Sequence, residues 1–70
     1  MMPLGLADAG DVGIIRKITG RDEVRQHLAE LGFVVGEQIS VVSELSGNMI
    51  LSVKDSRIAL DKTMAMRIMI

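Results

Sequence analysis

The feature that most constrains the fold of this chain is a short amphipathic segment that runs into a glycine. Val24, Leu28 and Leu31 recur at intervals of four and three residues, which places all three on one side of a helix. Gly32 follows where helices commonly end in a left-handed backbone conformation, which glycine adopts without strain. The sequence therefore predicts one short helix that ends at Leu31, with Phe33 directly after it as a hydrophobic anchor.

The rest of the chain has the pattern of short strands separated by turns. Gly36 leads into an alternating apolar and polar run, and turn-forming residues punctuate the chain beyond it. Gly13 predicts a bulge or sharp bend within the first strand. We expect strands at residues 12–18, 37–43, 49–53, 57–60 and 66–70. The prediction is a mainly β fold, a small SH3-like barrel of about five strands with one short α-helix inserted between strands 1 and 2, with an OB-type barrel as the alternative.

Two helix starts have candidate capping residues. Thr19 or Asp22 offers a side-chain oxygen to the free amides at the start of the main helix, where the negative charges of Asp22 and Glu23 are also favourable. Asp61 is expected to cap one helical or 3₁₀ turn that continues through Ala65.

The methionines near the end of the chain are predicted to divide between core and surface. Met64 and Met66 are expected to fill the core, since methionine adapts to irregular gaps. Met69 lies on the opposite face of the expected last strand and is predicted to be exposed.

Composition indicates one domain, residues 1–70, with more apolar surface than a small core can bury. Hydrophobic residues make up 49% of the 70 residues and the mean hydropathy is +0.37. Apolar pairs such as Ile14-Ile15 and Val34-Val35 point to both faces of the chain. An exposed apolar patch commonly marks a binding site for another protein, and self-association is an alternative way to bury it.

Several classes of function are disfavoured. The net charge is −1, the basic residues are scattered and Phe33 is the only aromatic residue, so nucleic-acid binding is not expected. No segment approaches the roughly 18 apolar residues that span a bilayer. The N-terminus has no secretion-signal pattern, and the absence of cysteine fits a reducing cytoplasm.

Catalytic and metal-binding patterns are also missing. No serine occupies a recognisable nucleophile turn, and no phosphate-binding glycine loop occurs, so we expect neither catalytic residues nor a cofactor. Glu23, His27 and Glu30 share one helical face and form the single metal-site hypothesis. One histidine without cysteine does not match the common zinc sets, so His27 is interpreted as a helix-surface residue and no metal site is expected.

The sequence resembles the FeoA family, the ferrous iron transport proteins A. Residues 28–37, Leu-Ala-Glu-Leu-Gly-Phe-Val-Val-Gly-Glu, resemble the family's helix–glycine motif. Residues 6–10 resemble its opening, residues 12–20 its first strand and the turn after it, and residues 57–61 and 65–68 its ending. Val35 stands where members often have proline, and Asp61 where many have arginine. The resemblance implies an SH3-like barrel, a cytoplasmic location and an accessory role in bacterial ferrous iron uptake, with a FeoB-type membrane GTPase permease as the partner.

These observations give two functional hypotheses. The first is a non-enzymatic module that docks onto the permease and modulates it, through the helix and its adjoining loop or an exposed strand edge. The second is a regulatory or peptide-binding module related to the C-terminal domain of metal-dependent repressors, which the lack of groove-lining aromatics disfavours. The residues expected to contact the partner are Arg25, His27, Glu30 and Met69, and those expected to maintain the structure are Val24, Leu28, Leu31, Gly32, Phe33 and Gly36.

Overall fold

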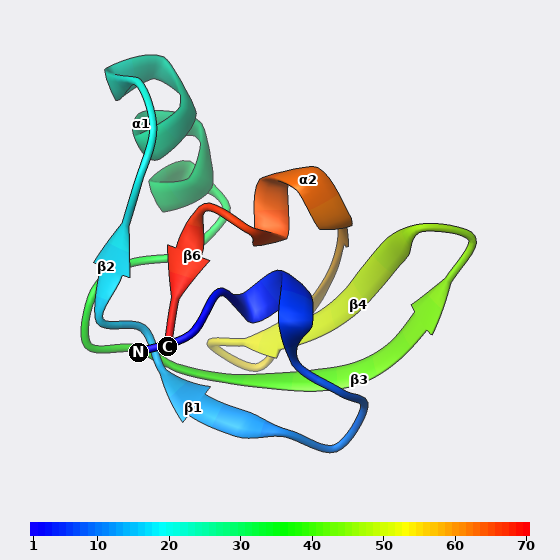
Figure 1. The fold of residues 1–70 in the computed structure, drawn as a ribbon. Coiled ribbons are helices and arrows are strands. Elements are labelled where there is room, and N and C mark those ends of the chain that lie inside the picture. The colour runs from blue at the N-terminus through cyan, green and yellow to red at the C-terminus, as the bar shows by residue number, and fades with distance from the viewer.

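Two antiparallel sheets and three short helical segments make up the fold (Figure 1). The computed structural model describes residues 1–70. The larger sheet has the strand order β1-β3-β4-β5, and β2 pairs with β6 in the smaller one. The elements are η1 (Leu4–Leu6), β1 (Val12–Ile14), β2 (Lys17–Ile18), α1 (Asp22–Glu30), β3 (Gln38–Leu45), β4 (Asn48–Val53), β5 (Ser56–Asp61), α2 (Lys62–Ala65) and β6 (Ile68–Met69).

The expected first strand is divided into β1 and β2. The N–H of Ile15 still donates to the carbonyl of Glu37, at the start of β3, but the N–H of Arg16 donates to the carbonyl of Met69 in β6. The chain therefore changes its pairing partner between Ile15 and Arg16, and this change gives six strands where the sequence predicted five. The other predicted strands are confirmed, with ends that differ by one or two residues.

Two tight hairpins set the register of β3, β4 and β5. Ser46-Gly47 and Lys54-Asp55 occupy the two hairpin turns, and all four residues have positive φ angles between 49° and 82°. Paired positive φ angles are typical of the two-residue turns that match the twist of the flanking strands. The single irregularity in this ladder lies in β3, between Val41 and Ser43, and not at Gly13 as predicted.

Gly13 allows the side chain of Ile70 to pack closely against the backbone of β1. An added Cβ at Gly13 would lie 3.1 Å from Cδ1 of Ile70, so the glycine lets the last residue approach the sheet. The two chain ends also pair, since Met2 and Ile70 exchange backbone hydrogen bonds of 2.8 Å in both directions. The N- and C-termini consequently lie side by side (Figure 1).

The core lies between the inner face of the larger sheet and the helical segments η1 and α2. Cross-strand neighbours such as Ile39 and Val53, or Val41 and Leu51, point into it together. No polar or charged residue is buried, so burial of apolar surface is the main stabilising contribution. The buried cluster consists of Leu4, Ala7, Ile15, Leu28, Phe33, Ile39, Val41, Met49, Leu51, Val53, Leu60, Ala65 and Ile68.

The larger sheet does not close on itself. Strands β1 and β5 are both edges, and no ladder joins them. The closed ring of strands expected from the sequence is therefore absent, although the mainly β architecture and the helix between early strands are confirmed. None of the helices has the length and apolar content that crossing a membrane requires.

The end of α1 is as predicted. Gly32 has φ of +105°, its N–H donates to the carbonyl of Ala29, and the N–H of Phe33 donates to the carbonyl of Leu28. This pair of bonds is the Schellman arrangement, which satisfies carbonyls at a helix C-terminus. Gly32 therefore both stops the helix and turns Phe33 back toward the core.

Both predicted caps at the start of α1 are wrong. Arg21 occupies the N-cap position and makes no side-chain cap bond, while Asp22 is already the first helical residue. The hydroxyl of Thr19 instead donates to the carbonyl of Arg67, because Thr19 continues the pairing of β2 with the C-terminal segment. The acidic first turn of Asp22 and Glu23 is confirmed.

The helix α1 stands at one end of the molecule (Figure 1). Leu28 is its only fully buried residue, whereas Val24 and Leu31 are partly buried against the core. The apolar stripe is thus confirmed, although only one of its three residues is fully buried.

The predicted placements of Met66 in the core and of Met69 on the surface are wrong. Met66 is 38% exposed and Met69 is half-buried, because Met66 ends α2 and does not belong to the last strand. The alternation on which the prediction depended therefore does not reach Met66. Its sulfur covers Gly5, where an added Cβ would lie only 2.6 Å away. Met64 is partly buried against the core, as expected.

The predicted cap of α2 is confirmed, and it allows a stability test. Oδ1 of Asp61 accepts a hydrogen bond of 2.8 Å from the N–H of Met64. Asp61→Ala should lower the free energy of unfolding by about 1 kcal/mol, since the amide loses its partner. Asp61→Asn keeps a capping oxygen and should lose much less. Urea unfolding followed by circular dichroism measures both, and equal losses would contradict the capping role.

Candidate docking surface

An apolar groove lies between α1, β2 and the loop that follows α1. Its volume is about 220 Å³, and five of its six lining residues are hydrophobic. We call it the α1–β2 groove. Its lining residues are Ile18 from β2, Arg25 and Ala29 from α1, and Phe33, Val34 and Val35 from the loop.

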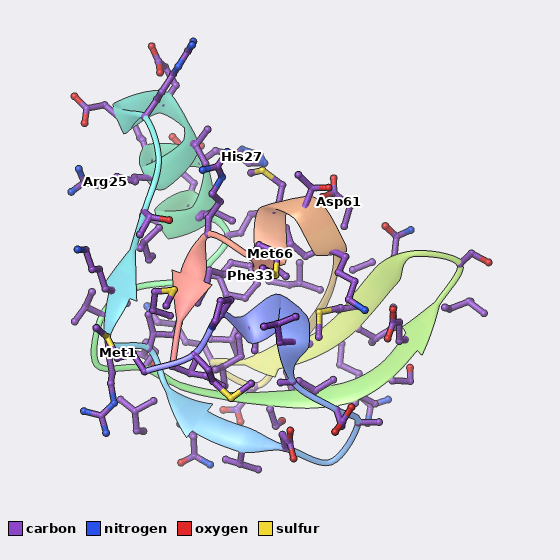
Figure 2. The ribbon with its side chains drawn as sticks, viewed as in Figure 1. Met1, Arg25, His27, Phe33, Asp61 and Met66 are labelled. Atoms are coloured by element: carbon purple, nitrogen blue, oxygen red, sulfur yellow. The ribbon has the colours of Figure 1, made fainter.

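Local backbone geometry fixes the loop side of the α1–β2 groove. The Schellman turn orients Phe33, which is fully buried and lies beneath α1 in Figure 2. Gly36 has φ of +96° and its N–H donates to the carbonyl of Ile15, while the N–H of Glu37 donates to the carbonyl of Val34. These bonds hold the loop as a tight bend, and Val35 projects from it with 63% of its surface exposed.

Arg25 gives the α1–β2 groove its only charge. Its guanidinium lies 3.5 Å from the carboxylate of Asp22, and both side chains are largely exposed. An exposed pair of this kind contributes little to stability, so Arg25 is free to exchange Asp22 for an acidic group of another protein. The groove therefore offers an apolar contact with a cation beside it.

The structure brings only one of the predicted contact residues to this groove. Arg25 lines it, whereas His27 lies on the opposite side of α1 (Figure 2). Glu30 is exposed on α1, and Met69 is half-buried in β6 opposite Lys17. Glu23, His27 and Glu30 do not form a cluster that could hold a metal ion.

Ile18, Ala29, Val34 and Val35 are groove residues that sequence reasoning did not select as contacts. The signal for two of them was present, since Val34-Val35 is an apolar pair in a loop, where solvent exposure usually favours polar residues. Ile18 and Ala29 become neighbours only through the placement of α1 beside β2, which the sequence pattern does not specify.

Two other hollows have only one hydrophobic lining residue each and fit a protein contact less well. One, of about 280 Å³, is lined mainly by the polar residues Glu37, Gln38, Ser40, Ser52, Lys54 and Asp55. The other, of about 600 Å³, is bordered by Gly20, Arg21, Val24 and Arg67. The α1–β2 groove is the hollow in which hydrophobic residues dominate, and protein interfaces are most apolar at their centre.

Solved structures with the same arrangement of elements define the class of fold. A crystal structure of an iron uptake regulatory protein, FeoA, has a TM-score of 0.89 and 36% identity, and the match covers 96% of this chain and 89% of that one. FeoA of Stenotrophomonas maltophilia in complex with zinc, described as a procaryotic SH3 domain protein, has a TM-score of 0.84 and 24% identity over 99% of this chain and 88% of that one. The protein is therefore a small SH3-like domain.

Sequence comparison gives the family. Residues 2–70 match the model of the FeoA domain. A protein of Methanocaldococcus jannaschii, provisionally named Fe(2+) transport protein A, is 34% identical over 70 residues, which are all of this chain and 85% of that protein. The chain belongs to the FeoA family of ferrous iron transport proteins, whose members are non-enzymatic accessory proteins.

Proposed function

We propose that this protein docks, at the cytosolic side of the membrane, onto the GTP-binding domain of a FeoB-type permease and modulates ferrous iron uptake. Membership of the FeoA family supports association with this transport system. The observation that carries the proposed contact is the α1–β2 groove, with Val35 exposed beside an apolar hollow.

The groove suits one apolar side chain of the permease flanked by an acidic residue. The apolar side chain would fill the hollow and cover Val35, which removes apolar surface from water on both sides. The acidic residue would pair with Arg25 in place of Asp22 and guide the orientation of the complex. His27 and Glu30 lie outside the hollow, so they contribute only if the permease also covers the exposed face of α1.

Val35→Glu tests this contact. The substitution places a charge where the proposed complex is dry, so the dissociation constant for the cytosolic domain of the permease should rise at least about tenfold. Calorimetric titration with and without nucleotide measures the effect, and the rate of GTP hydrolysis in the same samples reports modulation.

Leu45→Glu is the matched control. Leu45 is as exposed as Val35, at 69% against 63%, but it lies at the far hairpin end of β3. It should leave the dissociation constant unchanged. Wild-type affinity in Val35→Glu, or an equal loss in Leu45→Glu, would contradict docking through the groove. Failure of the wild-type protein to bind the permease domain at all would reject the proposed function itself.

A further inference from the structure

Strand β5 forms an unpaired edge of the larger sheet, and its charge pattern is unusual for such an edge. Strand β5 pairs only with β4, without a register shift, and contains neither proline nor glycine. Folded proteins usually protect such an edge with a bulge, a proline or like charges. On β5 the only charges are Arg57 and Asp61, which have opposite signs and lie four residues apart.

Hairpin geometry determines which backbone groups face outward. Val53 and Ser56 flank a two-residue turn, so they form a hydrogen-bonded pair, and such pairs then alternate along the ladder. The bond from the N–H of Lys62 to the carbonyl of Gly47 agrees with this alternation. Arg57 and Ala59 therefore direct their N–H and C=O groups away from β4, and Asp61 directs its N–H the same way.

These outward groups lack partners within the chain. No backbone bond of Arg57 or Ala59 occurs outside the regular ladders, and neither Arg57 nor Asp61 belongs to an ion pair. Both side chains are exposed, as is Ala59 between them. The edge therefore has backbone groups without partners and two charges without an ion pair, although Oδ1 of Asp61 caps α2.

We propose that β5 pairs with β5 of a second copy of this chain, antiparallel about a two-fold axis at Ala59. In this register Ala59 faces Ala59 of the second copy, and each Ala59 N–H donates to the other's carbonyl. Each Asp61 N–H donates to the carbonyl of Arg57 in the second copy. Each Arg57 side chain then faces Asp61 of the second copy, which gives two equivalent ion pairs on the exposed face of the sheet.

The charge pattern selects this register over its neighbours. Side chains directly opposite one another in such pairs have Cα atoms about 5.5 Å apart, so Arg57 and Asp61 reach each other readily. A shift that centres the pairing on Arg57 or on Asp61 places like charges opposite each other, which is destabilising. The pairing centred on Ala59 places both charges opposite partners of opposite sign, and it also satisfies the outward N–H groups of Ala59 and Asp61 and the outward C=O groups of Ala59 and Arg57.

The position of β5 makes this contact independent of the α1–β2 groove. Strands β5 and β1 are the two opposite edges of the larger sheet. The chain continues from β1 into β2, which lines the groove. A dimer formed at β5 therefore leaves the groove of each copy open, and the two copies form one continuous sheet. Pairing through a single short strand buries little area, so a weak dimer with a dissociation constant of about micromolar to millimolar is expected.

Analytical ultracentrifugation over a range of concentrations tests the dimer. The wild-type protein should show a monomer–dimer equilibrium, and Arg57→Glu should raise the dissociation constant at least about tenfold, since both ion pairs become like-charge pairs. Arg16→Glu makes the same charge change between β1 and β2, outside the proposed contact, and should leave the equilibrium unchanged. Asp61→Asn keeps the cap of α2, so its weaker dimerisation would reflect the lost charge and not unfolding.

A cysteine introduced at the two-fold axis tests the register. The chain has no cysteine, so Ala59→Cys gives one thiol that faces its own copy at a distance that a disulfide can span. It should cross-link much faster under mild oxidation than Ser43→Cys, which lies on β3 of the same sheet and not on β5. A strictly monomeric protein at millimolar concentration, equal cross-linking of the two variants, or β5 amides protected only by an extended segment of the permease would overturn the proposal.

Discussion

Phe33→Ala should remove a large fraction of the stability of the protein. Phe33 is the only aromatic residue and has 0% exposure, so truncation opens a cavity beneath α1 and removes the floor of the α1–β2 groove. Such substitutions typically cost about 3–5 kcal/mol. A 70-residue domain has a total stability of roughly 4–10 kcal/mol, so the loss is a large fraction of it.

Far-UV circular dichroism during urea unfolding measures this loss, because the chain has no tryptophan or tyrosine for fluorescence. Val35→Ala is the matched control, since it truncates a neighbouring but exposed side chain and should change the free energy of unfolding by less than about 0.5 kcal/mol. A loss below about 1 kcal/mol for Phe33→Ala would show that the residue is not central to the core.

Local sequence chemistry predicted the features that depend on a few neighbouring residues. The end of α1 at Gly32, the two hairpin turns and the cap at Asp61 each follow from one or two side chains and their backbone preferences. The apolar stripe of α1 could also be predicted, because its residues repeat with the period of a helix. The strand pattern and the family resemblance both predicted the SH3-like fold.

Features that depend on pairing between distant parts of the chain could not be predicted from the sequence pattern. The first strand is divided because the N–H of Arg16 donates to the carbonyl of Met69, far along the chain. Thr19 does not cap α1 because its hydroxyl donates to the carbonyl of Arg67, which is also distant in the sequence. Met66 was assigned to the wrong face because the strand boundary at Ile68 depends on pairing with Ile18.

The candidate site was predicted only in outline. The helix and its adjoining loop were selected, and Arg25 does line the α1–β2 groove. The groove itself forms between elements whose relative placement is tertiary, so Ile18 and Ala29 carried no sequence signal. The position of Val35 depends on the bend that Gly36 and Glu37 hold by hydrogen bonds, which a periodicity argument does not reveal.

Leu28→Ala should release α1 from the rest of the protein at a cost of about 2–5 kcal/mol. Leu28 is fully buried, whereas Leu31, one turn later on the same stripe, is only partly buried. Leu31→Ala should cost less, about 1–2 kcal/mol, because Leu31 keeps part of its surface exposed.

The two leucine variants should also differ in where the structure opens. Helix α1 has 9 residues, and an isolated helix of that length is not stable in water, so its attachment through Leu28 is what keeps it folded. In Leu28→Ala the amides of α1 should exchange hydrogen much faster while those of β3 and β4 remain protected, because these strands share a ladder that α1 does not join. Leu31→Ala should leave the exchange of α1 closer to wild type. Equal exchange in both variants, or a larger loss for Leu31→Ala, would show that the helix is held along its whole stripe and not mainly through one side chain.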